Sequence, residues 1–276
     1  MSILHTLHPD LPVSASYATL AVMLETATKA AQAAGEVLLR YFQMPDIERV
    51  TKGDLSFSTA ADLEAEKVVE EIIMSAQPDH GFLGEEGTLK NPDSEYQWIV
   101  DPLDGTSNFV SGIPLFAASI ALVKNNMPVI GVVNAPAINE FFVAEVGKGA
   151  TCNGKPIHVS KEQASTGIVL FGIGHEKEDH RRAHKIFSEA KNYFRSARLF
   201  GCASLDLAHV ARGAAEGYVM CTGVSPWDYA AGNLLITEAG GKVSDYDGKS
   251  CDLTCSHFIA TNGVTHDEFL KLVHLG

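Results

Sequence analysis

The residues best suited to chemistry lie in one segment, WIVDPLDGTSNFVSGIP, which covers residues 98–114. Its apolar start predicts a strand that delivers Asp101, and Pro102 then opposes a helix or an unbroken strand ladder. We therefore expect the chain to turn at the strand end, with Asp101 and Asp104 on the bend. There the two carboxylates can converge on one cation, whereas a straight strand would point them to opposite faces. The alternative is that both aspartates only stabilise Asx-turns.

Gly105, Thr106 and Ser107 come next and predict the start of a short helix. The free N–H groups and the positive dipole end of a helix N-terminus suit a phosphate group. The segment therefore combines candidate cation ligands with a candidate phosphate site.

Two further acidic positions could complete such a site. Glu85 lies in the turn GEEG, just before the Asp101 strand, and Asp228 follows a Pro-Trp pair at the start of a predicted helix. Clustered carboxylates repel one another unless cations neutralise them, and oxygen-only ligands favour hard ions such as Mg²⁺ or Mn²⁺. Taken singly, Glu85 could be a solvated turn residue and Asp228 a helix cap.

The elements that must position these residues change character along the chain. After an irregular stretch, residues 1–16, apolar periodicity predicts a helix over 17–42 and a second over 61–74. Turn signals then predict strands and an antiparallel meander. These strands are expected at 81–86, 97–101, 115–124, 128–135 and 140–146.

Beyond residue 153 the pattern alternates between strand-like and helix-like runs. We therefore predict an N-terminal arm (1–16), an α+β lobe (17–150) and an α/β lobe (151–276), packed as one unit around a cleft. The second lobe is expected to hold strands at 167–174, 196–201, 216–221 and 257–263, and helices at 179–194, 203–213, 227–241 and 266–274.

Composition excludes several classes of protein. The 276 residues carry a formal net charge of −13, which opposes direct binding to nucleic acid or an anionic membrane. No apolar run approaches the roughly 18 residues of a membrane span, and no Lys or Arg precedes Lys29, so we expect no basic targeting signal. Five cysteines are too few for a disulfide framework, and we expect free thiols in a reducing cytoplasm.

Taken in order, G-E-E, D-P-L-D-G-T-S-N-F and W-D-Y-A-A-G…E-A-G-G closely resemble the inositol monophosphatase family of Mg²⁺-dependent, lithium-sensitive sugar phosphatases. The resemblance covers roughly residues 52–241. It implies a layered α-β-α-β-α sandwich with mixed sheets in two lobes, and a homodimer. It also implies two or three divalent ions, with Asp101 bridging two of them. The implied metal ligands are Glu85, Asp101, the Leu103 carbonyl, Asp104, Asp228 and, for a third and weaker ion, Asp62.

The resemblance also implies roles around the phosphate. Thr106 and Asp62 match the pair that orients and deprotonates the attacking water, and Lys52 matches a lysine near that water. The phosphate would rest on the backbone amides of Gly105, Thr106 and Ser107.

The alcohol half of the substrate is implied with less detail. Gly201, Cys202 and Ala203 match a turn that contacts substrate hydroxyls through its backbone, beside Asp228. Inositol-specific members carry an acid that binds ring hydroxyls seven positions before this aspartate, where this chain has Cys221, so the resemblance places Cys221 beside the substrate. A thiol is a poor hydrogen-bond acceptor, so the change puts a preference for inositol in doubt.

The sequence thus predicts a Mg²⁺-dependent phosphomonoesterase for a small alcohol phosphate, with inositol 1-phosphate as the default substrate. Relatives with the same metal core act on histidinol phosphate, fructose 1,6-bisphosphate, 3′-phosphoadenosine 5′-phosphate or NADP. A different class of function is regulation through a protein partner, since some members of the family have such roles.

Overall fold

The computed structural model describes residues 17–42, 44, 49–52, 56–173, 180–221 and 223–275. The predicted N-terminal arm (1–16) lies outside these residues. Among the described residues, no helix is long and apolar enough to cross a membrane.

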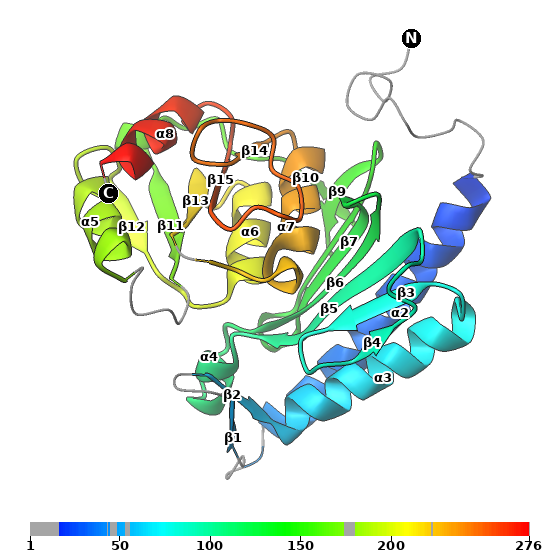
Figure 1. Cartoon of the computed structure of the whole chain (residues 1–276). Helices are drawn as coiled ribbons and strands as arrows, with labels where there is room; N and C mark the ends of the chain where they lie inside the picture. Colours follow the sequence, from blue (N-terminus) through cyan, green and yellow to red (C-terminus); the bar gives the residue numbers. More distant parts are fainter. Residues whose placement is uncertain are drawn as a thin grey trace.

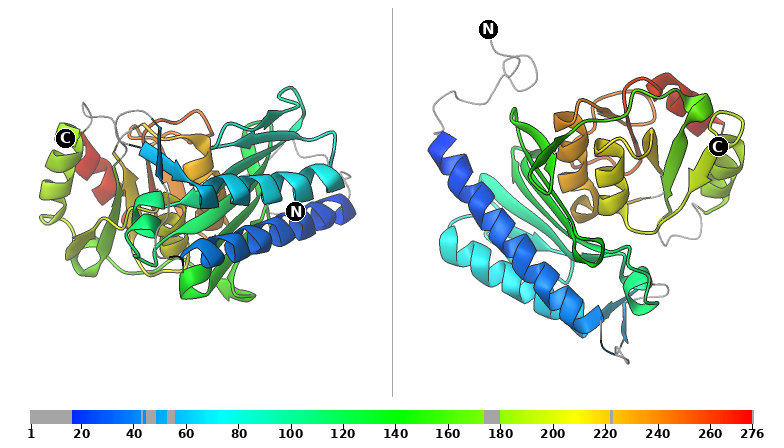
Figure 2. Two further views of the ribbon diagram at one scale, coloured as in Figure 1. Left: turned by 90° about the horizontal axis from the view of Figure 1, so that it is seen from below. Right: turned by 180° about the vertical axis from the view of Figure 1, so that it is seen from behind.

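The described elements form five layers, as Figure 1 shows. Two long helices, α2 (Tyr17–Phe42) and α3 (Ala60–Ala76), lie side by side on the outer face of the first sheet (Figure 2). Helices α6 (Ala203–Ala211) and α7 (Pro226–Glu238) fill the space between the two sheets. The outer face of the second sheet is covered by α5 (His180–Ala190) and α8 (His266–His274). This arrangement confirms the predicted α-β-α-β-α sandwich.

The first sheet has eight strands in the order β10-β9-β8-β7-β6-β5-β3-β4. Its centre is the predicted antiparallel meander, and β3 runs parallel to β5. The strands are β3 (Gly81–Gly84), β4 (Leu89–Lys90), β5 (Tyr96–Asp104), β6 (Ala117–Lys124), β7 (Met127–Ala135), β8 (Glu140–Glu145), β9 (Gly149–Cys152) and β10 (Lys155–Ile157). The lobe boundary that we predicted at residue 150 therefore falls inside β9, because a Gly-rich hairpin adds two strands to this sheet.

The second sheet has five strands in the order β12-β11-β13-β15-β14. Strand β11 runs parallel to both of its neighbours, whereas β15 pairs antiparallel with β13 and β14. The strands are β11 (Ile168–Gly172), β12 (Ser196–Arg198), β13 (Gly217–Met220), β14 (Lys242–Ser244) and β15 (Phe258–Thr261). A separate hairpin of β1 (Arg49–Lys52) and β2 (Ser56–Thr59) precedes α3, and a short helix, α4 (Thr106–Val110), follows β5.

Helix α2 packs closely because its buried face is built from alanines. Ala27, Ala30, Ala31 and Ala34 are fully buried, and their small side chains let the backbone approach its neighbours. The Asn134 side chain on β7 donates a hydrogen bond of 2.7 Å to the Ala31 carbonyl. This hydrogen bond fixes α2 against the first sheet, which carries part of the site.

The cysteines depart in part from expectation. Cys251 and Cys255 are joined as a disulfide, with Cα atoms 5.7 Å apart, so the prediction of free thiols is wrong for this pair. A turn at Asp252, whose carboxylate accepts a hydrogen bond from the Thr254 amide, brings the two cysteines together. The remaining cysteines, Cys152, Cys202 and Cys221, are free thiols.

Candidate active site

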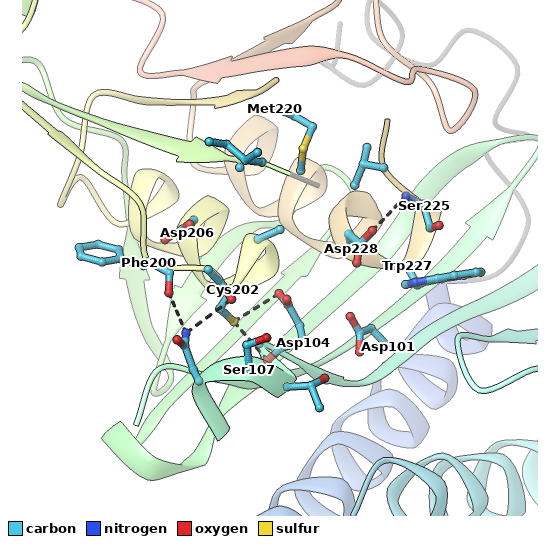
Figure 3. Close-up of a pocket in the computed structure, with 18 of the residues that line it drawn as sticks. Asp101, Asp104, Ser107, Phe200, Cys202, Asp206, Met220, Ser225, Trp227 and Asp228 are labelled. Atoms are coloured by element: carbon cyan, nitrogen blue, oxygen red, sulfur yellow. Dashed lines mark hydrogen bonds between the residues drawn. The ribbon is translucent and has the colours of Figure 1, made fainter. Parts of the chain in front are cut away.

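A cavity of about 580 Å³ opens between the two lobes (Figure 3). Its walls come from the end of β5, the start of α4, the turn after β3, the ends of β11 and β13, the segment before α6 and the start of α7, with Phe57 of β2 at one side. All of the predicted metal ligands except Asp62 line it. The predicted site residues on its wall are Glu85, Asp101, Leu103, Asp104, Gly105, Thr106, Ser107, Gly201, Cys202, Ala203 and Asp228.

Strand β5 does not end at Asp101, as we predicted, but continues through Pro102 to Asp104. Asp101 pairs with Ser119 and Asp104 pairs with Ala117, so β5 carries one more residue than β6 over this stretch. This extra residue is a β-bulge, where a proline without an N–H is tolerated. Since Ser119 and Ala117 lie on the same face of β6, the bulge also brings the two aspartates to one face.

The turn that carries Glu85 is held from below by a buried residue of α3. The carboxylate of Glu66, only 2% exposed, accepts hydrogen bonds from the amides of Glu86 (2.8 Å) and Thr88 (3.2 Å). A Cβ atom at position 84 would lie 2.3 Å from this carboxylate, which explains the glycine there. Our sequence reasoning missed Glu66. Its signal was the spacing of four from Asp62, which places both acids on one helix face.

Asp104 is held by the start of α6 from the second lobe. Its Oδ2 accepts hydrogen bonds from the Ser204 amide and the Ser204 hydroxyl, both at 2.6 Å, and from the Cys202 thiol at 3.3 Å. The carboxylate orientation is therefore set by residues 98–100 positions away in the sequence. The sequence placed Ser204 only at the end of the matched turn, residues 201–204, and did not predict its contact with Asp104, because nothing in the local pattern distinguishes it from a helix-start serine.

Asp228 and Asp62 occupy equivalent positions in their helices. Each is the third residue of its helix and closes a capping box: Asp228 accepts a hydrogen bond from the Ser225 amide at 3.0 Å, and Asp62 accepts one from the Thr59 amide at 2.8 Å. Asp228 therefore does cap a helix, as the simpler interpretation suggested, and it also lines the cavity. The cap fixes each carboxylate at a helix start.

Thr106 links the cavity to Asp62. Its hydroxyl lies 3.0 Å from the Leu103 carbonyl and 3.3 Å from Oδ1 of Asp62, which is itself 1% exposed. Thr106 follows Gly105, whose φ of 85° is left-handed and favours glycine. A Cβ atom at Gly105 would also lie 2.9 Å from the Leu115 carbonyl, so this turn cannot accept another residue without a shift.

Burial and mutual repulsion raise the pKa values of the clustered acids. Desolvation, followed by the charges of Glu85, Asp104 and Asp228, raises the pKa of Asp101 well above its usual value. The pKa of Asp228 is raised well above its usual value in the same way, first by desolvation and then by Asp104 and Glu85. Desolvation also raises the pKa of Asp104, although the hydrogen bonds from Ser204 act in the opposite direction.

These carboxylates form a donor set of the kind that a hard divalent cation neutralises. Within the described residues, however, no three His, Cys, Asp or Glu side chains are already arranged as ligands around one point. The donor chemistry therefore fits a magnesium-type ion, and we expect the side chains to close together when ions bind.

Besides Asp62, one predicted site residue with a described side chain does not line the cavity. Cys221 is fully buried in the outer core with Ile186 and Val219, and burial raises the pKa of its thiol to about 12. It lies behind the wall because side chains alternate along β13, so that Met220 faces the cavity instead. The prediction that Cys221 lies beside the substrate is corrected accordingly. Lys52 belongs to β1, but its side chain lies outside the described part of the structure.

Comparison with known proteins assigns the chain to a family. The sequence model of the inositol monophosphatase family matches residues 19–275, nearly the whole chain. The chain belongs to the inositol monophosphatase family. It is therefore a phosphatase, and the family is generally metal-dependent.

Several members of this family are similar over most of their length. An inositol-1-monophosphatase from Mesorhizobium japonicum is 39% identical over 259 residues, which are 91% of this chain and 96% of that protein. The Nus factor SuhB of Pasteurella multocida is 38% identical over 243 residues, or 86% of this chain and 90% of that protein. The solved inositol monophosphatase from Anabaena superposes with a TM-score of 0.83 at 39% identity, covering 93% and 96% of the two chains.

Proposed function

We propose that this phosphatase is a Mg²⁺-dependent phosphomonoesterase that hydrolyses the phosphate ester of a small alcohol by in-line attack of water. The observation that carries the proposal is the convergence of Glu85, Asp101, Asp104 and Asp228, from four separate stretches of chain, on one cavity beside the start of α4.

The metal ligands proposed are those of the family pattern. Glu85, Asp101 and the Leu103 carbonyl would hold one ion, and Asp101, Asp104 and Asp228 would hold a second. When bound, such ions neutralise charge on the phosphate oxygens and lower the pKa of water at the site. Asp62, buried below Thr106, would contribute to a third and weaker ion.

The chain's own groups then orient the water and remove its proton. The Thr106 hydroxyl accepts a hydrogen bond from the attacking water and donates its own proton toward Oδ1 of Asp62, 3.3 Å away. Desolvation raises the pKa of Asp62 to about 6, so its carboxylate is largely ionised at neutral pH and basic enough to take the proton. The amides of Gly105, Thr106 and Ser107 would hold the phosphate.

Phosphate release from a panel of phosphomonoesters tests the proposal, measured with Mg²⁺, with Mn²⁺ and with EDTA. We expect release that requires the metal, and we expect Asp101→Asn to abolish it while circular dichroism stays unchanged. Release that survives EDTA, or an Asp101→Asn variant with wild-type activity, would refute the metal mechanism.

The family pattern supports inositol 1-phosphate as the reference substrate in this panel. It also supports three accompanying proposals: a homodimer, inhibition by lithium and a cytoplasmic location. Size-exclusion chromatography with light scattering and a lithium titration of the activity test the first two.

A regulatory role is the second candidate, because a 38% identical relative is named a Nus factor. The net charge of −13 opposes direct contact with RNA, so such a role would run through a protein partner. Absence of phosphate release from every ester in the panel would favour this role.

A further inference from the structure

The cavity wall has two chemically different parts. One part carries the acidic cluster, and the other is predominantly apolar, made by Phe171, Ile173, Leu199, Phe200, Met220 and Val224. In Figure 3, Phe200 lies on the far side of Cys202 and Asp104 from Asp101, and Met220 lies above the carboxylates in this view. If the phosphate lies at the carboxylates, the rest of the substrate faces this apolar part.

The apolar part offers no counter-charge for a second phosphate. Among the described residues, no lysine or arginine lines the cavity. Arg182 on α5 instead stacks over the ring of Tyr246, at 4.9 Å from the ring centroid. The described wall therefore does not match a bisphosphate substrate.

The wall is also a poor match for a polyol. Each hydroxyl placed against an apolar surface loses its hydrogen bonds to water and gains no partner in return. Leu199 is 49% exposed although it lines the cavity, so an apolar ligand would cover a leucine that now faces solvent.

Two polar side chains interrupt this wall. The hydroxyl of Tyr218 contacts the Met220 sulfur at 3.9 Å, whereas the second side chain has no hydrogen-bond partner within the described part of the chain. Asp206, in the first turn of α6, lines the cavity and is 1% exposed, and neither of its carboxyl oxygens has a hydrogen-bond partner among the described residues. Buried polar groups are nearly always hydrogen-bonded, so an unpartnered carboxyl on a pocket wall points to a ligand group.

We propose that the alcohol portion of the substrate is an apolar or aromatic group with one hydroxyl or N–H that binds Asp206. The proposal rests on the phosphatase function above and specifies its substrate class. In this proposal Asp206 selects the alcohol portion of the substrate, and other groups bind the phosphate.

Phosphate esters with the same six-membered ring test the substrate class directly. We expect kcat/KM for cyclohexyl phosphate to exceed that for inositol 1-phosphate by at least about tenfold, because the wall leaves most inositol hydroxyls unpaired. Among the monophosphates of 1,2-, 1,3- and 1,4-cyclohexanediol, at least one isomer should exceed cyclohexyl phosphate by about tenfold. An equal or higher value for inositol 1-phosphate overturns the proposal.

Variants of Asp206 test the hydrogen bond. Asp206→Leu should abolish the advantage of the preferred diol over cyclohexyl phosphate, and Asp206→Asn should retain part of it, because asparagine keeps an acceptor oxygen. An undiminished advantage in Asp206→Leu overturns the role of Asp206. Phosphate release from none of these esters would instead refute the phosphatase proposal itself.

Leu199 supplies a test that does not depend on a buried substitution. Leu199→Ser should raise KM for cyclohexyl phosphate about tenfold with little change in kcat. Leu89→Ser is the matched control, because Leu89 is 57% exposed on β4 and does not line the cavity. If Asp206→Leu fails to fold, the Leu199 result decides, and an unchanged KM in Leu199→Ser overturns the proposal.

Discussion

The hydroxyl of Thr106 lies between the Leu103 carbonyl and Oδ1 of Asp62, at 3.0 and 3.3 Å. A threonine at the first turn of α4 thereby connects the cavity to a carboxylate that does not line it. The proposed route for the proton depends on this contact.

Removing the Thr106 hydroxyl should slow the reaction without emptying the metal site. We expect Thr106→Ala to lower kcat at least about 100-fold, the usual scale for losing a proton-transfer group, and Thr106→Ser to restore most of it. Steady-state kinetics measures the change in kcat, and calorimetric Mg²⁺ titration measures any change in metal affinity. Thr237→Ala, on the exposed side of α7, is the control. A loss of Mg²⁺ affinity without a loss of kcat would contradict the water-activating role.

The bond from Ser204 to Asp104 should contribute to metal affinity. Ser204→Ala removes the 2.6 Å hydroxyl bond but keeps the amide bond, so the carboxylate loses part of its orientation. Partners of metal ligands typically change affinity 10- to 100-fold, and we expect a Mg²⁺ affinity loss of about tenfold by calorimetry. Ser188→Ala, on the exposed surface of α5, should change nothing. Equal affinities in wild type and Ser204→Ala would refute this positioning role.

Glu66 should control the turn that presents Glu85. Glu66→Ala removes the acceptor of the Glu86 and Thr88 amides and leaves a cavity below Gly84. We expect lower Mg²⁺ affinity together with a lower melting temperature, because two partly buried amides lose their acceptor. Glu71→Ala, on the solvent side of the same helix, is the matched control for both measurements. A Glu66→Ala variant with normal Mg²⁺ affinity would show that the turn carrying Glu85 keeps its conformation without Glu66.

Without divalent ions, stability should fall as the pH rises. Desolvation raises the pKa of Asp62 from 3.8 to about 6, so between these values the native state binds more protons than the unfolded chain. The rise corresponds to about 3 kcal/mol of stability that is present at low pH and lost as the pH passes through about 6. In EDTA we therefore expect a higher melting temperature at pH 5 than at pH 7.5, and a smaller difference in Asp62→Asn. Identical pH profiles for the two proteins would contradict the shift.

Added Mg²⁺ should reverse the trend at neutral pH, because ions that bind only the native state stabilise it.

The fold was predictable where local patterns and the final packing agree. Apolar periodicity placed α2 at the observed residues 17–42, and turn signals located the central meander correctly. The bulge at Pro102 was not predictable, because a proline after a strand equally favours a turn. Only pairing with β6 decides between these outcomes.

The residues that line the site were predictable from the sequence, but the residues that hold them in place through hydrogen bonds were not. Motif order identified the carboxylates. The only signal for Glu66 was its spacing from Asp62, and Ser204 acts through a contact with Asp104 that the sequence does not reveal. Cys221 shows the reverse case. Counting seven positions back from Asp228 pointed to Cys221, but the phase of β13 turns this side chain into the outer core.

The position of α6 and α7 in the chain has a consequence for biosynthesis. Among the described residues, the last strand of the first sheet ends at Ile157 and β6 is buried along its whole length, yet the helices that cover one face of this sheet begin only at Ala203 and Pro226. During translation, this face emerges from the ribosome before its cover exists. Nascent chains that expose apolar sheet surface are prone to aggregate, so we expect this stage of synthesis to be the one that most needs a holding chaperone.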